Sequence, residues 1–326
     1  MIRGKIIATG SYVPENVITN LDLEKIVETS DDWITERTGI KERRIVNGSQ
    51  AASDLACEAA GLALKRAHLK PRDIDLIVVA TISGDMPFPS TACMVQNKLG
   101  AKNAAAFDLN AACSGFVYGL HIVNNLIRGG AHNRVLLIGA EALSKFIDWE
   151  DRATCILFGD GAGAVVIEPT KEKRGILSTK IHSDGNLGEL IMLPGGGSRN
   201  PCSRDSILKR MNYIKMKGNE TFRIAVRTLE EIAVRTLEEN NLTPEDLDLL
   251  IPHQANIRII QATAKRLNLP PEKVFVNIGK YGNTSAASIP IALDEAVTSG
   301  KVKDGDNILL EAFGGGLTWA SALLRW

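Results

Sequence analysis

The sequence has 326 residues, which is long enough to bury a substantial core and favours about two domains. Its 38 basic and 38 acidic side chains balance, which argues against a general nucleic-acid binder or a membrane-surface protein. No apolar run approaches the roughly 20 residues of a membrane helix. The N-terminus also lacks the continuous apolar stretch of a signal peptide.

The number and spacing of the cysteines indicate the redox state of the compartment in which the protein works. All five are widely spaced and none forms a C-x-x-C pair, a pattern that fits neither a disulfide framework nor a zinc site. Such cysteines are typical of a reducing environment. The sequence therefore predicts a cytoplasmic protein with no metal site.

In chain order, short β-rich runs alternate with helical patterns, which is typical of an α/β fold. A helix is expected at residues 51–69, where small and apolar residues recur three and four positions apart. Buried strands are expected at 74–81, 104–109, 134–141, 163–168, 247–253, 273–278 and 307–313.

An internal repeat relates the two parts of the chain. "LKPRDIDLIV" begins at Leu69 and "LTPEDLDLLI" at Leu242, an offset of 173 positions (242 − 69). The same offset relates the strands that begin at Arg134 and Asn307. We therefore predict two related halves, 1–171 and 172–326, with a shared interface at which a site can draw residues from both.

Cys113 is the candidate nucleophile. It lies in "FDLNAACSGF", between a predicted strand and a predicted helix. A cysteine in the first turn of a helix is favoured as a thiolate by the helix dipole and by free backbone N–H groups. A buried structural cysteine is the alternative interpretation, and the local context alone does not separate the two.

Two other polar residues occupy strand-to-helix junctions. His253 follows a buried strand in "IPHQANIRII", and Asn283 lies in "KYGNTSAASIP" at the repeat position of Asn110. Either one alone would more often be a capping or turn residue. Three polar residues at junctions of this kind favour a shared site, because α/β proteins build their sites at strand ends.

The sequence resembles the β-ketoacyl-acyl-carrier-protein synthase III family of the thiolase superfamily. The resemblance spans nearly the whole chain and is carried, in order, by "TSDDWITERTGIKERRI", "FPSTACMVQ", "AACSGF", "DWEDRATCILFGDGAGAVV", "PHQANIRII", "GNTSAASIP" and "FGGGLTWASALLRW". It implies a five-layer α-β-α-β-α thiolase-like fold built from two related halves, a homodimer, and a catalytic triad of Cys113, His253 and Asn283.

The resemblance also implies a reaction. A short acyl group passes from coenzyme A to Cys113, and malonyl-acyl carrier protein then loses CO₂ and attacks the acyl group, as in the initiation of fatty-acid synthesis. Coenzyme A is a substrate here and no cofactor is expected. The sequence does not distinguish among acetyl, propionyl and branched acyl groups as the primer.

Further site residues are implied by the same resemblance. The backbone N–H groups of Cys113 and Gly315 would form an oxyanion hole, and Phe313 and Phe88 would border the acyl pocket, Phe88 in the partner subunit. Coenzyme A would contact Thr29, Trp33, Arg37, Arg152, Gly218, Phe222 and Asn256. Arg258, Lys265 and Arg266 share one helix face and would dock the acidic carrier protein, unless they are simply a solvated face.

Two segments have less specific interpretations. The eight-residue repeat at 224–239 is expected on one long helix with ordinary surface pairs. The Gly/Ser/Pro-rich segment 193–206 is either a loop that gates the acyl pocket or a surface excursion.

Rival functions differ in their residues. A thiolase would have a second cysteine where this chain has Phe313, and an elongating synthase a second histidine where it has Asn283. A hydroxymethylglutaryl-CoA synthase would need a glutamate base before the nucleophile, for which no strong candidate is evident. A Cys-His-Asn hydrolase would have to admit water, and an intact triad argues against a non-catalytic scaffold.

Overall fold

The computed structural model describes residues 2–326 as two main β-sheets with helices between and outside them. The larger sheet has the strand order β1-β7-β6-β4-β5 and the smaller one β11-β12-β13-β8. The strands of the larger sheet are β1 (Arg3–Tyr12), β4 (Leu76–Ala80), β5 (Ala105–Leu109), β6 (Val135–Glu141) and β7 (Gly161–Thr170). Those of the smaller sheet are β8 (Gly175–Ser183), β11 (Leu249–Pro252), β12 (Asn307–Gly314) and β13 (Thr318–Arg325).

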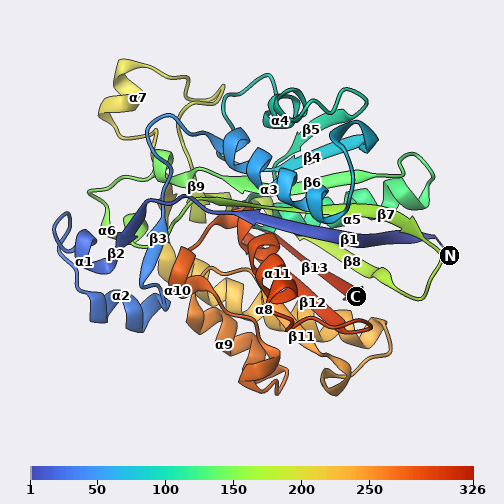
Figure 1. Cartoon of the computed structure of the whole chain (residues 1–326). Coiled ribbons are helices and arrows are strands. Elements are labelled where there is room, and N and C mark those ends of the chain that lie inside the picture. Colours follow the sequence, from blue (N-terminus) through green and yellow to red (C-terminus); the bar gives the residue numbers. More distant parts are fainter. Residues whose placement is uncertain (1) are drawn as a thin grey trace.

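Alternation along the strands explains the layering. In β4, Leu76 and Val78 face the core between the sheets, whereas Ile77 and Val79 face the outer helices α3 (Ala52–Arg66) and α4 (Thr91–Leu99). Helices α5 (Gly115–Arg128) and α11 (Ser288–Thr298) fill the inner layer, and α8 (Gly218–Glu239) and α9 (Ile257–Arg266) cover the far side of the smaller sheet (Figure 1). This arrangement is the predicted five-layer α-β-α-β-α fold.

The offset of 173 is visible in the structure. The 3₁₀ turn Ala112–Ser114 leads into α5, and the 3₁₀ turn Ser285–Ala287 leads into α11 at the corresponding place. Ala112 and Ser285, 173 positions apart, have nearly equal positive φ angles of 46° and 47°. The larger sheet takes its strands from residues 3–170 and the smaller from 175–325. Both sheets contribute to one inner core. The predicted division into the halves 1–171 and 172–326 stays a prediction.

One predicted strand is wrong. Residues 273–278 form only a single bridge, between Val274 and Leu250, rather than a fifth strand of the smaller sheet. The reason is the buried side chain of Gln254, whose Oε1 accepts from the backbone N–H groups of Asn277 and Ile278 at 2.9 and 3.2 Å. These bonds replace the strand ladder, so the backbone groups are satisfied without strand pairing.

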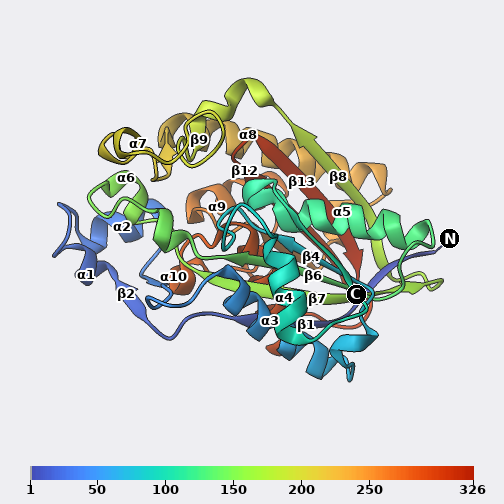
Figure 2. The same cartoon turned by 90° about the horizontal axis from the view of Figure 1, so that it is seen from above.

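Smaller elements gather at the end of the molecule away from the N-terminus (Figures 1 and 2). They are α1 (Asn20–Leu23), α2 (Asp31–Thr38), α6 (Arg152–Cys155), α7 (Arg204–Leu208), α10 (Ile278–Tyr281) and the short strands β2 (Val17–Thr19), β3 (Glu42–Arg44), β9 (Ile191–Met192) and β10 (Lys215–Met216). The repeat at 224–239 lies on the long helix α8, as predicted. Across residues 2–326, no helix is both long and apolar enough to cross a bilayer.

Candidate active site

A cavity of about 510 Å³ lies where the two halves meet. Its lining is mostly apolar, with a few polar groups that converge on one region, which is the usual composition of a small-molecule site. Of the predicted site residues, the structure brings these together around the cavity: Cys113, His253, Asn283, Gly315, Phe313, Gly218, Phe222 and Asn256.

Cys113 lies on the 3₁₀ turn between β5 and α5. Its position depends on a close approach from the other half, because a Cβ built on Gly314 would meet the Cys113 backbone N at 2.6 Å. Only a glycine fits this contact between β12 and the nucleophile turn. The two halves therefore hold Cys113 jointly.

The predicted ionisation of Cys113 is wrong. Burial raises the pKa of this thiol to about 12, with a smaller opposing contribution from Ser285. The sequence argument relied on the N-terminus of a helix, but α5 begins at Gly115, two residues later. Because desolvation outweighs the dipole here, the sulfur is a neutral thiol at pH 7 and needs a proton acceptor before it can attack.

His253 follows β11 and is buried, with its Nδ1 2.6 Å from Ser288 Oγ. The backbone N–H of Gln254 donates to the same hydroxyl at 3.4 Å, so Ser288 is free to donate its proton to Nδ1. This network assigns the ring proton to Nε2, which has no other hydrogen-bond partner among the described residues. Burial lowers the pKa of His253 to about 3, so the ring is neutral and offers a donor to the cavity.

Asn283 is held by backbone contacts to the first half. Its N–H donates to Leu157 O at 2.8 Å, and Gly159 N donates to its carbonyl at 3.0 Å. The side-chain Oδ1 accepts from Ser285 N at 2.8 Å. Because the oxygen is used inside the turn, the Nδ2 group remains as a donor in the cavity that Asn283 lines.

Gly282 makes this turn possible. Its φ of 63° lies in the left-handed region, and a Cβ there would meet Leu157 O at 2.8 Å. A larger residue would therefore displace both the bend and the contact between the halves that fixes Asn283.

The two predicted acyl-pocket residues behave differently. Phe313 is buried at the end of β12 and lines the cavity together with Ala225 and Leu229 of α8. Phe88 is 84% exposed and does not line the cavity of its own chain. Its predicted role in a partner's pocket stays a prediction.

The residues predicted to contact coenzyme A form two groups. Gly218, Phe222 and Asn256 line the cavity itself. Thr29, Trp33, Arg37 and Arg152 lie outside its lining, and the Asn256 side chain links the groups by donating to Arg37 O at 3.0 Å.

Trp33 is flanked by two guanidinium groups. Arg37 and Arg152 lie 4.6 and 4.8 Å from the centroid of its ring, and Arg152 also donates to Glu28 O at 2.8 Å. A nucleotide base can stack on a ring face covered by an arginine only by moving that guanidinium aside.

The three residues predicted for carrier-protein docking lie on α9 and are all exposed: Arg258, Lys265 and Arg266. Arg258 also lies over the ring of Phe222, which lines the cavity, with its guanidinium carbon 5.7 Å from the centroid. The cationic face of α9 is therefore next to the cavity.

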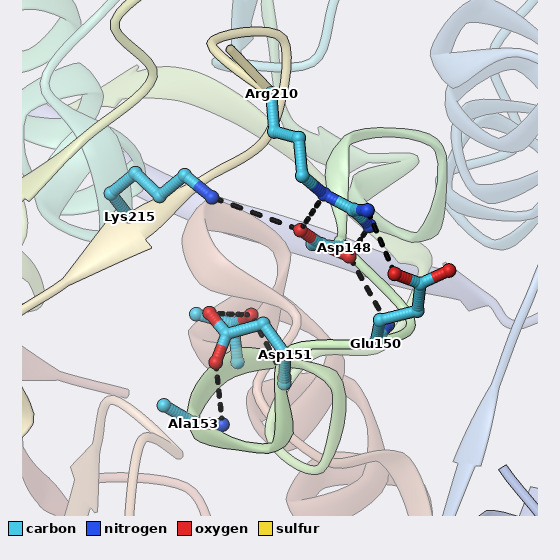
Figure 3. A network of polar contacts seen from close by, with 7 residues as sticks. Asp148, Glu150, Asp151, Ala153, Arg210 and Lys215 are labelled. Carbon is cyan, nitrogen blue, oxygen red and sulfur yellow. Dashed lines mark hydrogen bonds and ion pairs between the residues drawn. The ribbon is translucent and has the colours of Figure 1, made fainter. Parts of the chain in front are cut away.

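The segment 193–206 belongs to a longer excursion, residues 193–214, that forms one wall of the cavity through Leu193 and Ile214. A cluster of charges ties it to the chain near α6 (Figure 3). Arg210 donates from Nε to Asp148 at 2.7 Å, makes a second bond to the same carboxylate, and contacts Glu150 at 2.7 Å. The Arg210 hydrogen bonds hold the pKa of Asp148 below its usual value.

Two residues of the site escaped the sequence analysis: Ser288 and Ser285. Ser288 orients His253, and Ser285 lines the cavity two residues after Asn283. The spacing of the serines in "NTSAASIP", two and five positions after Asn283, was the only signal available in the sequence. Among residues 2–326, no group of three or more His, Cys, Asp or Glu is placed to hold a metal ion.

Comparison with known proteins decides the family. The model of the 3-oxoacyl-[acyl-carrier-protein] synthase III family matches residues 107–185, and that of its C-terminal part matches residues 237–326. A β-ketoacyl-[acyl-carrier-protein] synthase III from Caldanaerobacter subterraneus is 56% identical over 325 residues, covering 100% of this chain and 98% of the relative. The chain belongs to the β-ketoacyl-acyl-carrier-protein synthase III family.

Solved structures of the family share this fold. The crystal structure of the 3-oxoacyl-[acyl-carrier-protein] synthase III of Aquifex aeolicus VF5 has a TM-score of 0.92 at 54% identity and covers 99% of this chain and 100% of that one. The enzyme from Thermus thermophilus has a TM-score of 0.91 at 45% identity, with 99% of each chain covered. The predicted family and the predicted thiolase-like fold are both confirmed.

Proposed function

We propose that this chain condenses a short acyl primer, delivered as its coenzyme A thioester, with malonyl-acyl carrier protein, and so initiates fatty-acid synthesis. Membership of the family makes the chain an acyltransferase of the condensing type. One observation supports the assignment of residues above all others: Cys113 from one half and His253 and Asn283 from the other line the same cavity.

The first half-reaction is acyl transfer to Cys113. The sulfur attacks the thioester carbonyl, the bond to the coenzyme A sulfur breaks, and coenzyme A leaves with a proton. Negative charge develops on the carbonyl oxygen in the transition state, and we assign its stabilisation to the backbone N–H groups of Cys113 and Gly315. The packing of β12 on the Cys113 turn supports this assignment.

The second half-reaction needs the two side-chain donors. When the malonyl thioester loses CO₂, an enolate forms whose oxygen carries negative charge, and hydrogen bonds from His253 and Asn283 lower the energy of that state. The enolate carbon then attacks the carbonyl carbon of the acyl group on Cys113. The bond between that carbon and the Cys113 sulfur breaks, and the sulfur leaves as a thiolate that recovers a proton. The products are a 3-ketoacyl-acyl carrier protein, coenzyme A and CO₂. No cofactor takes part in these steps.

The two substrates would approach from the end of the molecule that carries α2 and α9. Trp33 and the neighbouring guanidinium groups suit the adenine and phosphates of coenzyme A, while Asn256, Gly218 and Phe222 border its path into the cavity. The cationic face of α9 suits an acidic carrier protein. Unchanged affinity for the carrier after replacement of Arg258, Lys265 and Arg266 by Glu would contradict that role.

We also propose that two copies associate along β5, in the reducing cytoplasm for which the free cysteines are suited. In the single chain β5 is an edge strand paired only to β4, and Phe107 on it is 37% exposed. Phe88 is 84% exposed nearby in the sequence. Unpaired edges with apolar side chains are normally covered. Sedimentation as a monomer at micromolar concentration would contradict the dimer.

The assignment of Cys113 is tested by covalent labelling. In the Cys113→Ser variant we expect no stable adduct from radiolabelled acetyl-CoA, because a serine hydroxyl at this position is a far weaker nucleophile than the sulfur. The exposed Cys93 is the matched control, and Cys93→Ser should label as the parent does. A labelled adduct that persists in Cys113→Ser would overturn the assignment, and release of free acetate without malonyl carrier would favour a hydrolase.

A further inference from the structure

The assigned donors leave the Cys113 proton without an acceptor. The sulfur is a neutral thiol at pH 7, and it has to lose its proton as it attacks the thioester. His253 is unsuited to this task, because Ser288 occupies Nδ1 and the ring proton lies on Nε2, the atom without another partner. A nitrogen that already carries hydrogen donates and does not accept.

Glu141 is a buried acid whose charge acts on the nucleophile. Glu141 ends β6 and has no exposed surface. Its Oε2 accepts from Ser83 Oγ, from Ile82 N at 3.2 Å and from Thr81 Oγ1 at 3.3 Å. Its other oxygen, Oε1, has no well-aligned hydrogen-bond partner among the described residues. One oxygen is therefore anchored and the other is available.

Ser285 is the residue that influences both this carboxyl group and the thiol. Its side chain is buried and lines the cavity, and its hydroxyl has no hydrogen-bond partner among the described residues. The turn that carries it packs directly against β6, since a Cβ on Gly139 would meet Ala286 O at 2.2 Å. The Ser285 hydroxyl lowers the pKa of both Cys113 and Glu141, against the larger effect of burial, so it interacts with each.

We propose that Ser285 and Glu141 form a path that takes the proton from Cys113 during acyl transfer. The S–H donates to Ser285 Oγ while the Ser285 O–H donates to Glu141 Oε1, so that one proton moves from sulfur to carboxylate. The new S–C bond forms, the bond to the coenzyme A sulfur breaks, and the departing thiolate takes one proton back. In this path Ser285 takes the proton from the sulfur directly, whereas Glu141 acts through Ser285 and is a positioning residue.

The state of Glu141 makes it suited to this exchange. Burial raises the pKa of Glu141 to about 7, so the carboxyl both loses and gains a proton near neutral pH. The groups that face it are Ser83, Ile82 N, Ser285, Ala286 N and, more weakly, Cys113 and Thr81, none of which is cationic. No ion pair therefore holds Glu141 permanently in its charged form.

The test is the pH dependence of Cys113 acylation, followed by rapid-quench labelling with acetyl-CoA. The inference rests on the proposed function, since it needs Cys113 to be the acylated thiol. In the parent chain the rate should rise with pH around 7 as Glu141 ionises. In Glu141→Gln the rate should fall by roughly 10²-fold and lose this rise, and Ser285→Ala should behave in the same way.

If Glu141 acted on Cys113 only through its charge, or only as part of the structure, the acylation rate of Glu141→Gln would not fall in this way. The negative charge of Glu141 raises the pKa of Cys113, so its removal without a relay would ease ionisation and make Glu141→Gln faster than the parent. A faster or unchanged rate in a variant with the parent's thermal stability would overturn the proposal. If the parent itself failed to label Cys113, the proposed function would fail instead.

A second variant keeps the test sharp if Glu141→Gln fails to fold. The Ser83 hydroxyl lowers the pKa of Glu141 by donating to Oε2, the oxygen that the proposed path does not use. Ser83→Ala should therefore shift the midpoint of the rate profile to higher pH while keeping its height at high pH. A midpoint that stays in place would contradict the path.

Discussion

At the scale of single residues, the site depends on which atom of each side chain is already engaged. Ser288 engages Nδ1 of His253, and the Ser285 amide engages Oδ1 of Asn283. These two bonds leave Nε2 and Nδ2 as donors facing one cavity. Two donors aimed at one position are what a developing enolate oxygen requires.

The contact of Gly314 with Cys113 gives a prediction at this scale. In Gly314→Ala the added Cβ would lie 2.6 Å from Cys113 N and 3.2 Å from its Cα, so the nucleophile turn has to move. We expect the acylation rate to fall by at least roughly 10²-fold, because a shift of about 1 Å at a reacting atom has that effect. Gly48→Ala is the matched control, since nothing lies within 4 Å of its Cβ position. Equal rates in both variants would contradict the account.

At the scale of elements, hydrophobic pattern predicted most of the fold. The buried strands at Leu76–Ala80 and Val135–Glu141 are continuous apolar runs, and the repeat offset placed the two turns before α5 and α11 in register. Pattern failed at 273–278, where the buried Gln254 takes the backbone partners that a strand would use. A side chain from a different segment cannot be inferred from local periodicity.

The sequence predicted which residues line the site but not their ionisation or all of their neighbours. Residue type and position at strand ends indicated Cys113, His253 and Asn283, and all three line the cavity. The ionisation of Cys113 was predicted in the wrong direction, because burial and the start of α5 are properties of the folded chain. Glu141 stands at the end of a strand as well, yet only the packing of β6 on the 285–287 turn relates it to the sulfur.

The excursion 193–214 gives a prediction at the element scale. Arg210 joins it to the buried carboxylate of Asp148, and the excursion walls the cavity. In Arg210→Ala we expect faster hydrogen exchange over 193–214 and a KM for acyl-CoA raised by about 2- to 5-fold, in line with about 0.5–1 kcal/mol for a partly exposed pair. The neighbouring Lys209 pairs within the excursion, with Asp205 at 2.9 Å, so Lys209→Ala is the control. Equal exchange in the two variants would refute the tether.

At the scale of the whole molecule, one inner core joins the two halves. Leu76 and Val78 from the larger sheet and Ile251 and Leu310 from the smaller one belong to the same cluster as α5 and α11. The cavity lies at the edge of this core, so each half positions part of the site against the other. Stability and activity should therefore be lost together on denaturation.

Glu311 gives a prediction for the stability of the whole chain. It is fully buried on β12, neither carboxylate oxygen has a well-aligned partner among the described residues, and burial raises its pKa to about 8. The folded chain therefore holds a proton there that the unfolded chain has already lost above pH 4.5, and the free energy of unfolding falls as pH rises toward 8. His253 acts in the opposite sense, but only below its unfolded value of 6.5.

From pH 7 to 8 Glu311 contributes most of this change, because Glu141, with a pKa of about 7, has already lost half of its proton at pH 7. There we expect urea unfolding to show a loss of up to about 1.4 kcal/mol per pH unit in the parent. This slope should be reduced in Glu311→Gln to the smaller part that Glu141 contributes, and retained in the control Glu238→Gln, which changes an exposed carboxylate on α8. The same slope in all three chains would contradict the assignment.

The central claim is that one thiol and two donors from opposite halves divide the reaction between them. The most direct measurement is CO₂ release from malonyl-acyl carrier protein by chains first acylated on Cys113. We predict that His253→Ala and Asn283→Ala accept the acyl label as the parent does, yet release CO₂ roughly 10²- to 10³-fold more slowly, because each lacks a donor to the enolate. Release at the parent's rate from either acylated variant would contradict the account.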